Sequence, residues 1–397
     1  GGILFLGGGS TVTIAQRMFE GMNSFALLAI PLYTFAGFTM SKGGISKRLM
    51  DFCYSIVGHI YGGLAHVNVL SSMIFAGISG SAVADTAGVS GMFMPEMVRK
   101  GYSKNFTVAV TAISSTIGII IPPSIPMVVI AGICGISTGK LFLGGIIPGV
   151  LCGLAQMIVS YFMAKKEGVP KEPGHFTIGP VLHGLWESWP ALLMPIIIVG
   201  TITMGIVSPT EAGVIAVVYG LFAGGIIYRE LKWEDIKFAF AETVRTSGRI
   251  FIVIGAAKLY TVMLTTAGFD KWVAKTMLGF STNPTVILIM ILLIFFIVTM
   301  FMESIATLTL FMPILYPIAL GVGIDPIVLS VLITVVIGVG LVTPPVGMCI
   351  YVACDLMDVT VGEVFPTLVP FIAATFVCIA LMVAFPQLIL LPTYLMA

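Results

Sequence analysis

The sequence contains an internal repeat, and this repeat constrains the fold more than any other feature. When the chain is aligned with itself so that Ala84 meets Ala306, the stretch from Ala84 to Pro148 matches the stretch from Ala306 to Pro370 without a gap. Glycine and proline fix backbone geometry, so the sequence predicts two copies of one pattern of bent and broken segments. The coinciding glycines and prolines are Pro95/Pro317, Gly101/Gly323, Gly118/Gly340, Pro122/Pro344, Pro123/Pro345 and Pro148/Pro370.

The two copies differ in charge at one equivalent turn. Around Gly101 the first copy has Arg99 and Lys100, whereas around Gly323 the second copy has Asp325 and no base. Basic loops of membrane proteins stay in the cytoplasm, so we expect the two copies to lie upside down relative to each other. An inverted repeat that Gly and Pro interrupt in corresponding places is typical of a secondary transporter with a binding site near the bilayer midplane.

Composition places the chain in the membrane class. Of its 397 residues, 58% are hydrophobic and 9% are charged, far from the composition of soluble domains. The net charge of +1 says nothing about partners, and no basic tract points to nucleic acid. The six cysteines lack metal-ligand spacing, so we interpret them as small apolar residues. A span needs about 20 apolar residues, and such stretches lie at 24–41, 142–164, 188–207, 211–228, 247–267 and 364–393.

We therefore expect an all-α polytopic membrane protein in which each copy contains a re-entrant hairpin, a broken spanning helix and a closing span. Residues 1–63 would form an N-terminal scaffold helix and surface arm, and residues 64–164 the first transport repeat. Residues 165–283 would hold a central loop, scaffold helices and a second arm, and residues 284–397 the second transport repeat. The chain opens at Gly1 with neither a methionine nor a signal peptide, which suggests that a further N-terminal helix precedes it.

Polar residues at the tip of the first hairpin form one candidate site. Ser79, Ser81 and Asp85 stand in the middle of an apolar segment, where such groups are costly unless they line a cavity or bind something. The structural alternative is that they only cap the returning half-helix. The GxSG spacing also matches the nucleophile loop of an intramembrane serine protease, which needs a histidine base in the membrane. The four histidines lie instead on the surface segment or in the central loop, at His59, His66, His175 and His183.

A double proline after a glycine interrupts each copy a second time. Because proline lacks the backbone donor, we expect free carbonyls at Gly118, Ile119, Gly340 and Leu341. Free carbonyls with nearby hydroxyls suit a small hard cation such as sodium, while half-helix N-termini favour a carboxylate. We expect a first sodium site at Ser79, Ser81, Asp85 and Gly118. A second, pseudo-symmetric site is predicted at Ser304, Thr307, Gly340 and Thr343.

The substrate is expected between the two hairpin tips and the two breaks, carried across by the hairpins as one body. The same self-alignment pairs Ser81 with Glu303, which would place one carboxylate near each tip. Lys258 is the only base deep in a span, and it would pair with an acid, bind a substrate carboxylate or snorkel to the surface. The predicted substrate-binding residues are Ser81, Ser124, Glu303, Thr343 and Lys258. The run from Ser208 to Glu211 is predicted to start a helix.

Several long motifs, in order along nearly the whole chain, resemble the large membrane subunit of tripartite ATP-independent periplasmic (TRAP) transporters. They are AIPLYTFAG at 29–37, GHIYGGLAHVNVLSSMIFAGISGSAVAD at 58–85, IGIIIPPSIPM at 117–127, SPTEAG at 208–213 and LVTPPVGM at 341–348.

This resemblance implies a sodium-driven importer in the bacterial inner membrane that moves organic acids by an elevator motion. Substrates of the family include C4-dicarboxylates, sialic acid and other sugar or keto acids. It also implies two protein partners in addition to membrane lipid, a small four-helix membrane subunit and a periplasmic substrate-binding protein. Sodium would be the only bound ion. The alternatives are a stand-alone sodium/dicarboxylate symporter of similar repeat design and a membrane-embedded enzyme.

Overall fold

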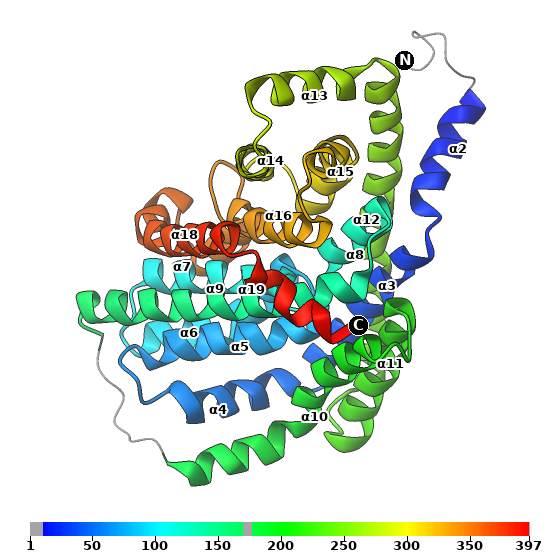
Figure 1. The fold of residues 1–397 in the computed structure, drawn as a ribbon. Helices are drawn as coiled ribbons and strands as arrows, with labels where there is room; N and C mark the ends of the chain where they lie inside the picture. The colour runs from blue at the N-terminus through cyan, green and yellow to red at the C-terminus, as the bar shows by residue number, and fades with distance from the viewer. Residues whose placement is uncertain (1–10, 170–176, 397) are drawn as a thin grey trace.

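The computed structural model describes residues 11–169 and 177–396, and every regular element within these ranges is a helix (Figure 1). Seven helical segments in the described ranges are long and apolar enough to cross a bilayer. They are Phe25–Lys42, Thr138–Glu167, Ile178–Thr203, Pro209–Ile227, Trp233–Thr266, Ser304–Gly321 and Val361–Ala384. The predicted all-α polytopic membrane fold is thereby confirmed.

The first half of the chain forms an arm, a hairpin and a broken helix. The opening elements and the arm are α2 (Thr11–Met22), η1 (Phe25–Leu28), α3 (Ala29–Lys42) and α4 (Ile45–Val57). The first hairpin consists of α5 (Gly63–Ser79) and α6 (Ala82–Arg99). The broken helix and its closing span are α7 (Lys104–Ser115), η2 (Thr116–Ile119), α8 (Ile125–Cys134) and α9 (Thr138–Glu167).

The second half repeats this order after two connecting spans. The connecting spans are α10 (Ile178–Thr203) and α11 (Pro209–Phe222), which continues into the π-helical turn η3 (Ala223–Ile227). The following span and arm are α12 (Trp233–Thr266) and α13 (Phe269–Phe280). The second hairpin, broken helix and closing elements are α14 (Pro284–Thr299), α15 (Ser304–Gly321), α16 (Pro326–Gly340), α17 (Met348–Met357), α18 (Val361–Ala384), α19 (Gln387–Leu390) and η4 (Leu391–Met396).

The helix limits repeat with the spacing found in the sequence. The self-alignment that pairs Ala84 with Ala306 also brings α6 onto α15, and each helix has 18 residues. Gly101 and Gly323 both adopt positive φ, at 91° and 82°, and each break contains one cis Pro-Pro bond. The arms α4 and α13 also start alike, after a left-handed glycine, and they lie at opposite ends of the molecule in Figure 1. The two copies therefore share a backbone, while their opposite orientation in the bilayer stays a prediction.

The two copies interlock, and this brings their irregular parts together. The half-helix α8 packs against α15 of the second hairpin, and α17 packs against α6 of the first hairpin. The closing span α18 lies on α7 and α9, where Phe106 and Phe371 stack with ring centroids 6.3 Å apart. Each broken helix thus runs from its own hairpin to the hairpin of the other copy, so tips and breaks meet in one region.

Glycines on α9 allow the first broken helix to come close. A Cβ added at Gly145 would overlap the carbonyl oxygen of Ile120, and one at Gly149 would overlap the Ile121 side chain. Small residues are the usual means by which membrane helices approach each other, since packing and hydrogen bonds must replace the hydrophobic effect there. The closing span of the first copy therefore fixes the break of the same copy.

Two helix boundaries differ from the sequence expectation, and one motif agrees with it. The last span ends at Ala384 rather than near 393, because Pro386 follows and cannot continue the ladder. The span predicted from residue 247 begins at Trp233, with acidic residues in its first turn that favour a helix start. The predicted start at Ser208 is confirmed, since Glu211 N donates to Ser208 Oγ at 3.3 Å and Ser208 N to Glu211 Oε2 at 2.6 Å.

Candidate functional site

The tip of the first hairpin, residues 79–81, is shaped by a left-handed glycine and two serines. Gly80 has a φ of 66°, and Ser79 Oγ accepts a hydrogen bond from Ser81 N at 3.3 Å. Ser81 Oγ accepts from Ala84 N at 3.4 Å and caps α6. The capping role considered from the sequence is therefore present at Ser81. Because Ser81 Oγ only accepts in these contacts, its proton remains available to a ligand.

Backbone hydrogen bonds join each hairpin tip to the break of its own copy. In the first copy Ile125 N donates to Gly80 O at 3.2 Å. In the second copy Val346 N donates to Met300 O at 3.0 Å. The first tip is thus attached to the first residue of α8, directly after the irregular segment 120–124, and the second tip to the irregular segment 341–347. These bonds place each tip beside the break of its own copy.

Asp85 is the outstanding side chain of this region. It is 2% exposed, and its Oδ2 accepts no hydrogen bond from any residue that the structure describes. The oxygen lies directly against Gly118, where an added Cβ would overlap it. The Ser79 hydroxyl interacts with the same carboxyl group. A buried charge without a partner is strongly unfavourable, so this carboxylate requires a proton or a bound cation.

Three of the four carbonyls that the sequence predicted to be free already accept hydrogen bonds. Ile119 O accepts from Ser124 Oγ at 2.5 Å, and its equivalent Leu341 O accepts from Cys349 N at 2.9 Å. Gly340 O accepts from Thr343 N at 3.1 Å. That expectation was wrong for these three, because the chain after each break folds back onto them. Among the described residues, no donor reaches the Gly118 carbonyl, so it alone of the four remains open to a cation.

The second tip, residues 300–303, uses its carboxylate differently. Glu303 Oε2 accepts from Ile305 N at 2.8 Å and from Ala306 N at 3.3 Å, while Ser304 Oγ donates to Oε1 at 2.6 Å. Glu303 is thus the N-cap of α15, at the position where Ser81 caps α6. A carboxylate that is already satisfied by its own helix is poorly suited to bind an anionic substrate. The structure therefore disfavours the predicted substrate role of Glu303.

The two threonines of the second predicted sodium site donate their hydroxyl protons to backbone carbonyls. Thr307 Oγ1 donates to Glu303 O at 3.0 Å, and Thr343 Oγ1 donates to Val339 O at 2.7 Å. Their oxygens keep lone pairs that can face a cation. Gly340 lies against Thr299 of α14. A Cβ added at Gly340 would be only 2.7 Å from the Thr299 Cβ. The second site has hydroxyl oxygens, but it has no unpartnered carboxylate like Asp85.

Two other predicted substrate residues are placed unfavourably. Ser124 is fully buried, donates to Ile119 O and accepts from Met127 N at 3.3 Å, so its proton is already used. Lys258 is exposed on α12, and its stem packs against Gly21 of α2. Within residues 11–169 and 177–396 Lys258 has no acidic partner, so the alternative in which it pairs with an acid is not realised.

Contacts between the two copies complete the site, and the sequence did not reveal them. The Cys349 thiol at the start of α17 interacts with the Thr86 hydroxyl of α6. Gly338 of α16 faces Thr116, whose Cβ would be 3.3 Å from a Cβ added at the glycine. In the sequence Thr116 stands two residues before Gly118, and no periodicity indicates which helix it meets.

Four half-helices begin in this region, and one of them lacks a side-chain cap. Ser81, Ser124 and Glu303 accept hydrogen bonds from the first turns of α6, α8 and α15. The N-cap of α17 is Gly347, which has no side chain to accept them. Of the first-turn amides, Cys349 N already donates to Leu341 O, so the N–H groups of Met348 and Ile350 remain available to a negative group.

Comparisons with known proteins agree with this architecture. A family model described as the DctM component of the tripartite ATP-independent periplasmic transporter matches residues 2–388. The chain is 36% identical over 377 residues to the sialic acid TRAP transporter large permease protein of Vibrio cholerae, covering 95% of this chain and 88% of the relative. It is 34% identical over 394 residues to the C4-dicarboxylate TRAP transporter large permease protein of Pseudomonas aeruginosa, covering 99% and 92%.

A further relative is longer than this chain, and solved structures share only the fold. The isethionate TRAP transporter permease protein of Oleidesulfovibrio alaskensis is 37% identical over 360 residues, and the chain spans only 57% of that relative's length. The crystal structure of the Alcanivorax borkumensis YdaH transporter superposes with a TM-score of 0.63 at 13% identity, covering 95% of this chain and 88% of that one. At that identity the likeness concerns the arrangement of helices.

Proposed function

The chain belongs to the DctM component family of tripartite ATP-independent periplasmic transporters, and from this premise we propose that it carries an organic acid across the inner membrane together with sodium. Membership identifies a multi-pass permease subunit and excludes the membrane-embedded enzyme. The names of relatives refer to sialic acid, C4-dicarboxylate, 2,3-diketo-L-gulonate and isethionate. The first three are carboxylates and isethionate is a sulfonate, so the proposed substrate of this chain is an organic anion.

The observation that carries the sodium proposal is the unpartnered Oδ2 of Asp85 beside the open carbonyl of Gly118. With the hydroxyls of Ser79 and Ser81 nearby, these groups offer oxygen ligands of the kind that small hard cations prefer. A sodium ion there would neutralise a charge that otherwise stands alone in a buried region. The second site, at Ser304, Thr307, Gly340 and Thr343, is proposed on hydroxyl and carbonyl oxygens alone.

The substrate carboxylate is proposed to bind between the first tip and the start of α17. Ser81 keeps a proton to donate, and the first turn of α17 has no side-chain cap to compete with the ligand. Sodium bound at Asp85 would cancel the negative charge of this carboxylate, which removes its repulsion of an anion on the same side. Binding of the ion and of the substrate would thereby support each other, as coupled transport requires.

The transport cycle is proposed to move the two hairpins and broken helices as one body. The exchange of contacts between the copies, α8 with α15 and α17 with α6, favours joint motion over separate opening of each half. A small membrane subunit and a periplasmic binding protein are the proposed partners, because the family name describes a tripartite system. Family membership favours this assembly over the stand-alone symporter.

The direct test is uptake by proteoliposomes that contain this chain, with and without its two partners. Labelled organic acid delivered by the binding protein should accumulate under an inward sodium gradient and not when choline replaces sodium at equal ionic strength. Uptake that is indifferent to this replacement would contradict sodium coupling. Full uptake by the chain alone, without the binding protein, would instead support the stand-alone symporter.

A further inference from the structure

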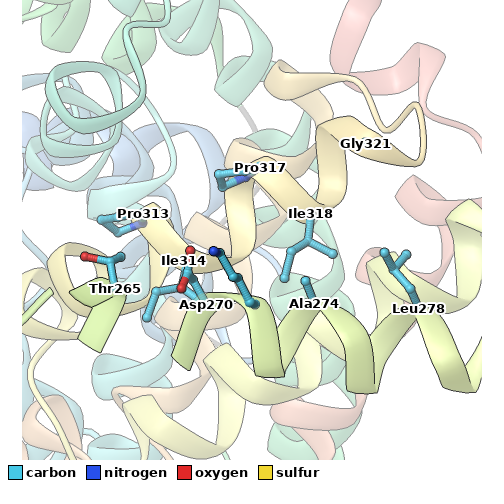
Figure 2. Close-up of a pocket in the computed structure, with 10 residues that line it drawn as sticks. Thr265, Asp270, Ala274, Leu278, Pro313, Ile314, Pro317, Ile318 and Gly321 are labelled. Atoms are coloured by element: carbon cyan, nitrogen blue, oxygen red, sulfur yellow. The ribbon is translucent and has the colours of Figure 1, made fainter. Parts of the chain in front are cut away.

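A cavity outside the transport site lies between the second arm and the second hairpin (Figure 2). It measures about 320 Å³, at the small end of the range for ligand pockets. One wall comes from the end of α12 and from α13, and the other from α15. The residues that matter for its chemistry are Asp270, Lys271, Ala274, Pro313, Pro317 and Ile318.

The cavity contains two adjacent residues of opposite charge that do not neutralise each other. Asp270 Oδ1 is shielded from solvent, and no described residue donates a hydrogen bond to it. Lys271 also lines the cavity, is exposed and forms no ion pair with any described residue. An anionic ligand would be repelled by Asp270, and a simple cation by Lys271. The charges therefore match a ligand that carries a positive and a negative group close together.

The surroundings place this cavity at the surface of the bilayer. Phe269 and Trp272 stack at 5.6 Å on α13 and are 36% and 62% exposed, and Phe280 at its end is 77% exposed. Aromatic residues on a short amphipathic helix are typical of the headgroup region. Pro313, Pro317 and Ile318 give the opposite wall an apolar face. A headgroup fits the charges, and the first carbons of an acyl chain fit the prolines.

We propose that this cavity binds the headgroup of a phospholipid with a primary ammonium, phosphatidylethanolamine. The ammonium donates to Asp270 Oδ1, and the phosphate lies beside the Lys271 ammonium. Phosphatidylcholine also carries both charges, but its quaternary ammonium has no N–H to satisfy the carboxylate oxygen. Phosphatidylglycerol has no cation for Asp270. The cavity is too small for a whole phospholipid, so the acyl chains lie outside it, along α15.

The test uses the purified full-length protein and a phosphatidylethanolamine that carries a photoactivatable diazirine in one acyl chain near the glycerol. Crosslinks, mapped by mass spectrometry, are expected on α13 and α15. An excess of unlabelled phosphatidylethanolamine should suppress them, whereas equal amounts of phosphatidylcholine or phosphatidylglycerol should not. Stronger competition by either of these two lipids would overturn the proposal.

Three variants and two matched controls locate the site. Asp270→Asn should lower the labelling about tenfold, as expected for the loss of one hydrogen bond between charged groups. Lys271→Met should lower it less, and Ala274→Leu should block the cavity without removing a charge. The controls are Asp355→Asn, an exposed acid on α17, and Lys275→Met, the next lysine on α13.

Size-exclusion profiles identify any variant that fails to fold. If Asp270→Asn is lost in this way, Ala274→Leu decides on its own, since it removes no polar group. Labelling that stays unchanged in the folded variants, or that falls equally in the controls, would show that the cavity is not a phosphatidylethanolamine site.

Discussion

The second helices of the two hairpins, α6 and α15, have matching limits, but the two copies differ in the seam, the contact between hairpin and broken helix. In the first copy Asn68 Nδ2 donates to Thr111 Oγ1 at 2.7 Å, and Ser114 Oγ donates to Asn68 Oδ1 at 3.1 Å. In the second copy the positions aligned with Thr111 and Ser114 are the apolar Ile333 and Val336. Glycine and proline hold both backbones in the same shape, so the side chains inside them were free to diverge.

The tips differ in the same sense. Asp85, one turn into α6, leaves an oxygen without a partner, whereas Glu303 spends both oxygens on the first turn of α15. The first copy therefore combines a polar, hydrogen-bonded seam with a carboxylate that is available to a ligand. In the second copy the seam is apolar, and the carboxylate at the tip accepts hydrogen bonds from its own helix. Backbone pseudo-symmetry does not imply two equivalent ion sites.

The largest effect expected from this comparison concerns orientation. Arg99 and Gly321 are equivalent, exposed positions at the ends of α6 and α15. Arg99→Cys and Gly321→Cys, each made in a Cys134→Ser background, should react with an impermeant maleimide from opposite sides of the membrane. Only one of the two should therefore be labelled in intact cells, and both after permeabilisation. Equal labelling in intact cells would contradict the inverted arrangement.

The next effect concerns the equivalent glycines of the two breaks. Gly118→Ala would push a methyl group into Asp85 Oδ2, and overpacking of about 1–3 kcal/mol corresponds to roughly a fivefold to 150-fold loss of sodium affinity. Gly340→Ala meets Thr299 instead and should lower thermal stability more than sodium affinity. Half-saturating sodium for uptake and the unfolding temperature separate the two effects. If both variants shifted the half-saturating sodium concentration equally, the proposed difference in sodium binding between the two copies would be wrong.

A smaller effect is expected from the polar seam. Asn68→Leu removes the hydrogen bonds of Asn68 with Thr111 and Ser114 and a third, to Met97 Sδ at 3.7 Å. Interhelical bonds in membranes contribute about 0.6 kcal/mol each on average. We therefore expect a loss of about 1–2 kcal/mol in unfolding free energy. Met290→Leu on α14, the first helix of the second hairpin, is apolar and nearly isosteric, so it should cost less than about 1.5 kcal/mol. Unfolding in detergent measures both, and a larger loss in Met290→Leu would show that the seam does not stabilise the first copy.

The smallest effect is expected outside both copies, at Lys258. Its side chain is exposed and unpaired within the described part of the chain, so Lys258→Met should leave uptake within about twofold, as for most exposed substitutions. Lys42→Met on α3 is the control. Unlike Lys258, Lys42 has a defined partner, since its Nζ lies 4.8 Å from the centroid of the Phe238 ring. A large, selective loss of uptake in Lys258→Met would restore a substrate role for this residue.

The sequence was sufficient to predict the repeated backbone, but not the hydrogen bonds and contacts within the site. Gly101, Pro122 and their equivalents act locally, so a single alignment of the chain with itself reveals them. The occupation of the Ile119 and Leu341 carbonyls depends on how the chain returns after each break, which no local rule specifies. The contact of Asp85 with Gly118 is a tertiary property, although both residues were chosen from the sequence for their chemistry and depth.

The central claim is that only the first copy holds sodium through a carboxylate. Binding of radioactive sodium to the purified protein tests this claim, with Asp85→Asn compared with Glu303→Gln. Removing one partner from a buried charged site costs about 3–5 kcal/mol, so Asp85→Asn should weaken binding at one site by roughly a hundredfold or more. Glu303→Gln keeps an acceptor at the helix cap, and the account predicts nearly unchanged sodium affinity. Unchanged binding in Asp85→Asn, or an equal loss in both variants, would contradict it.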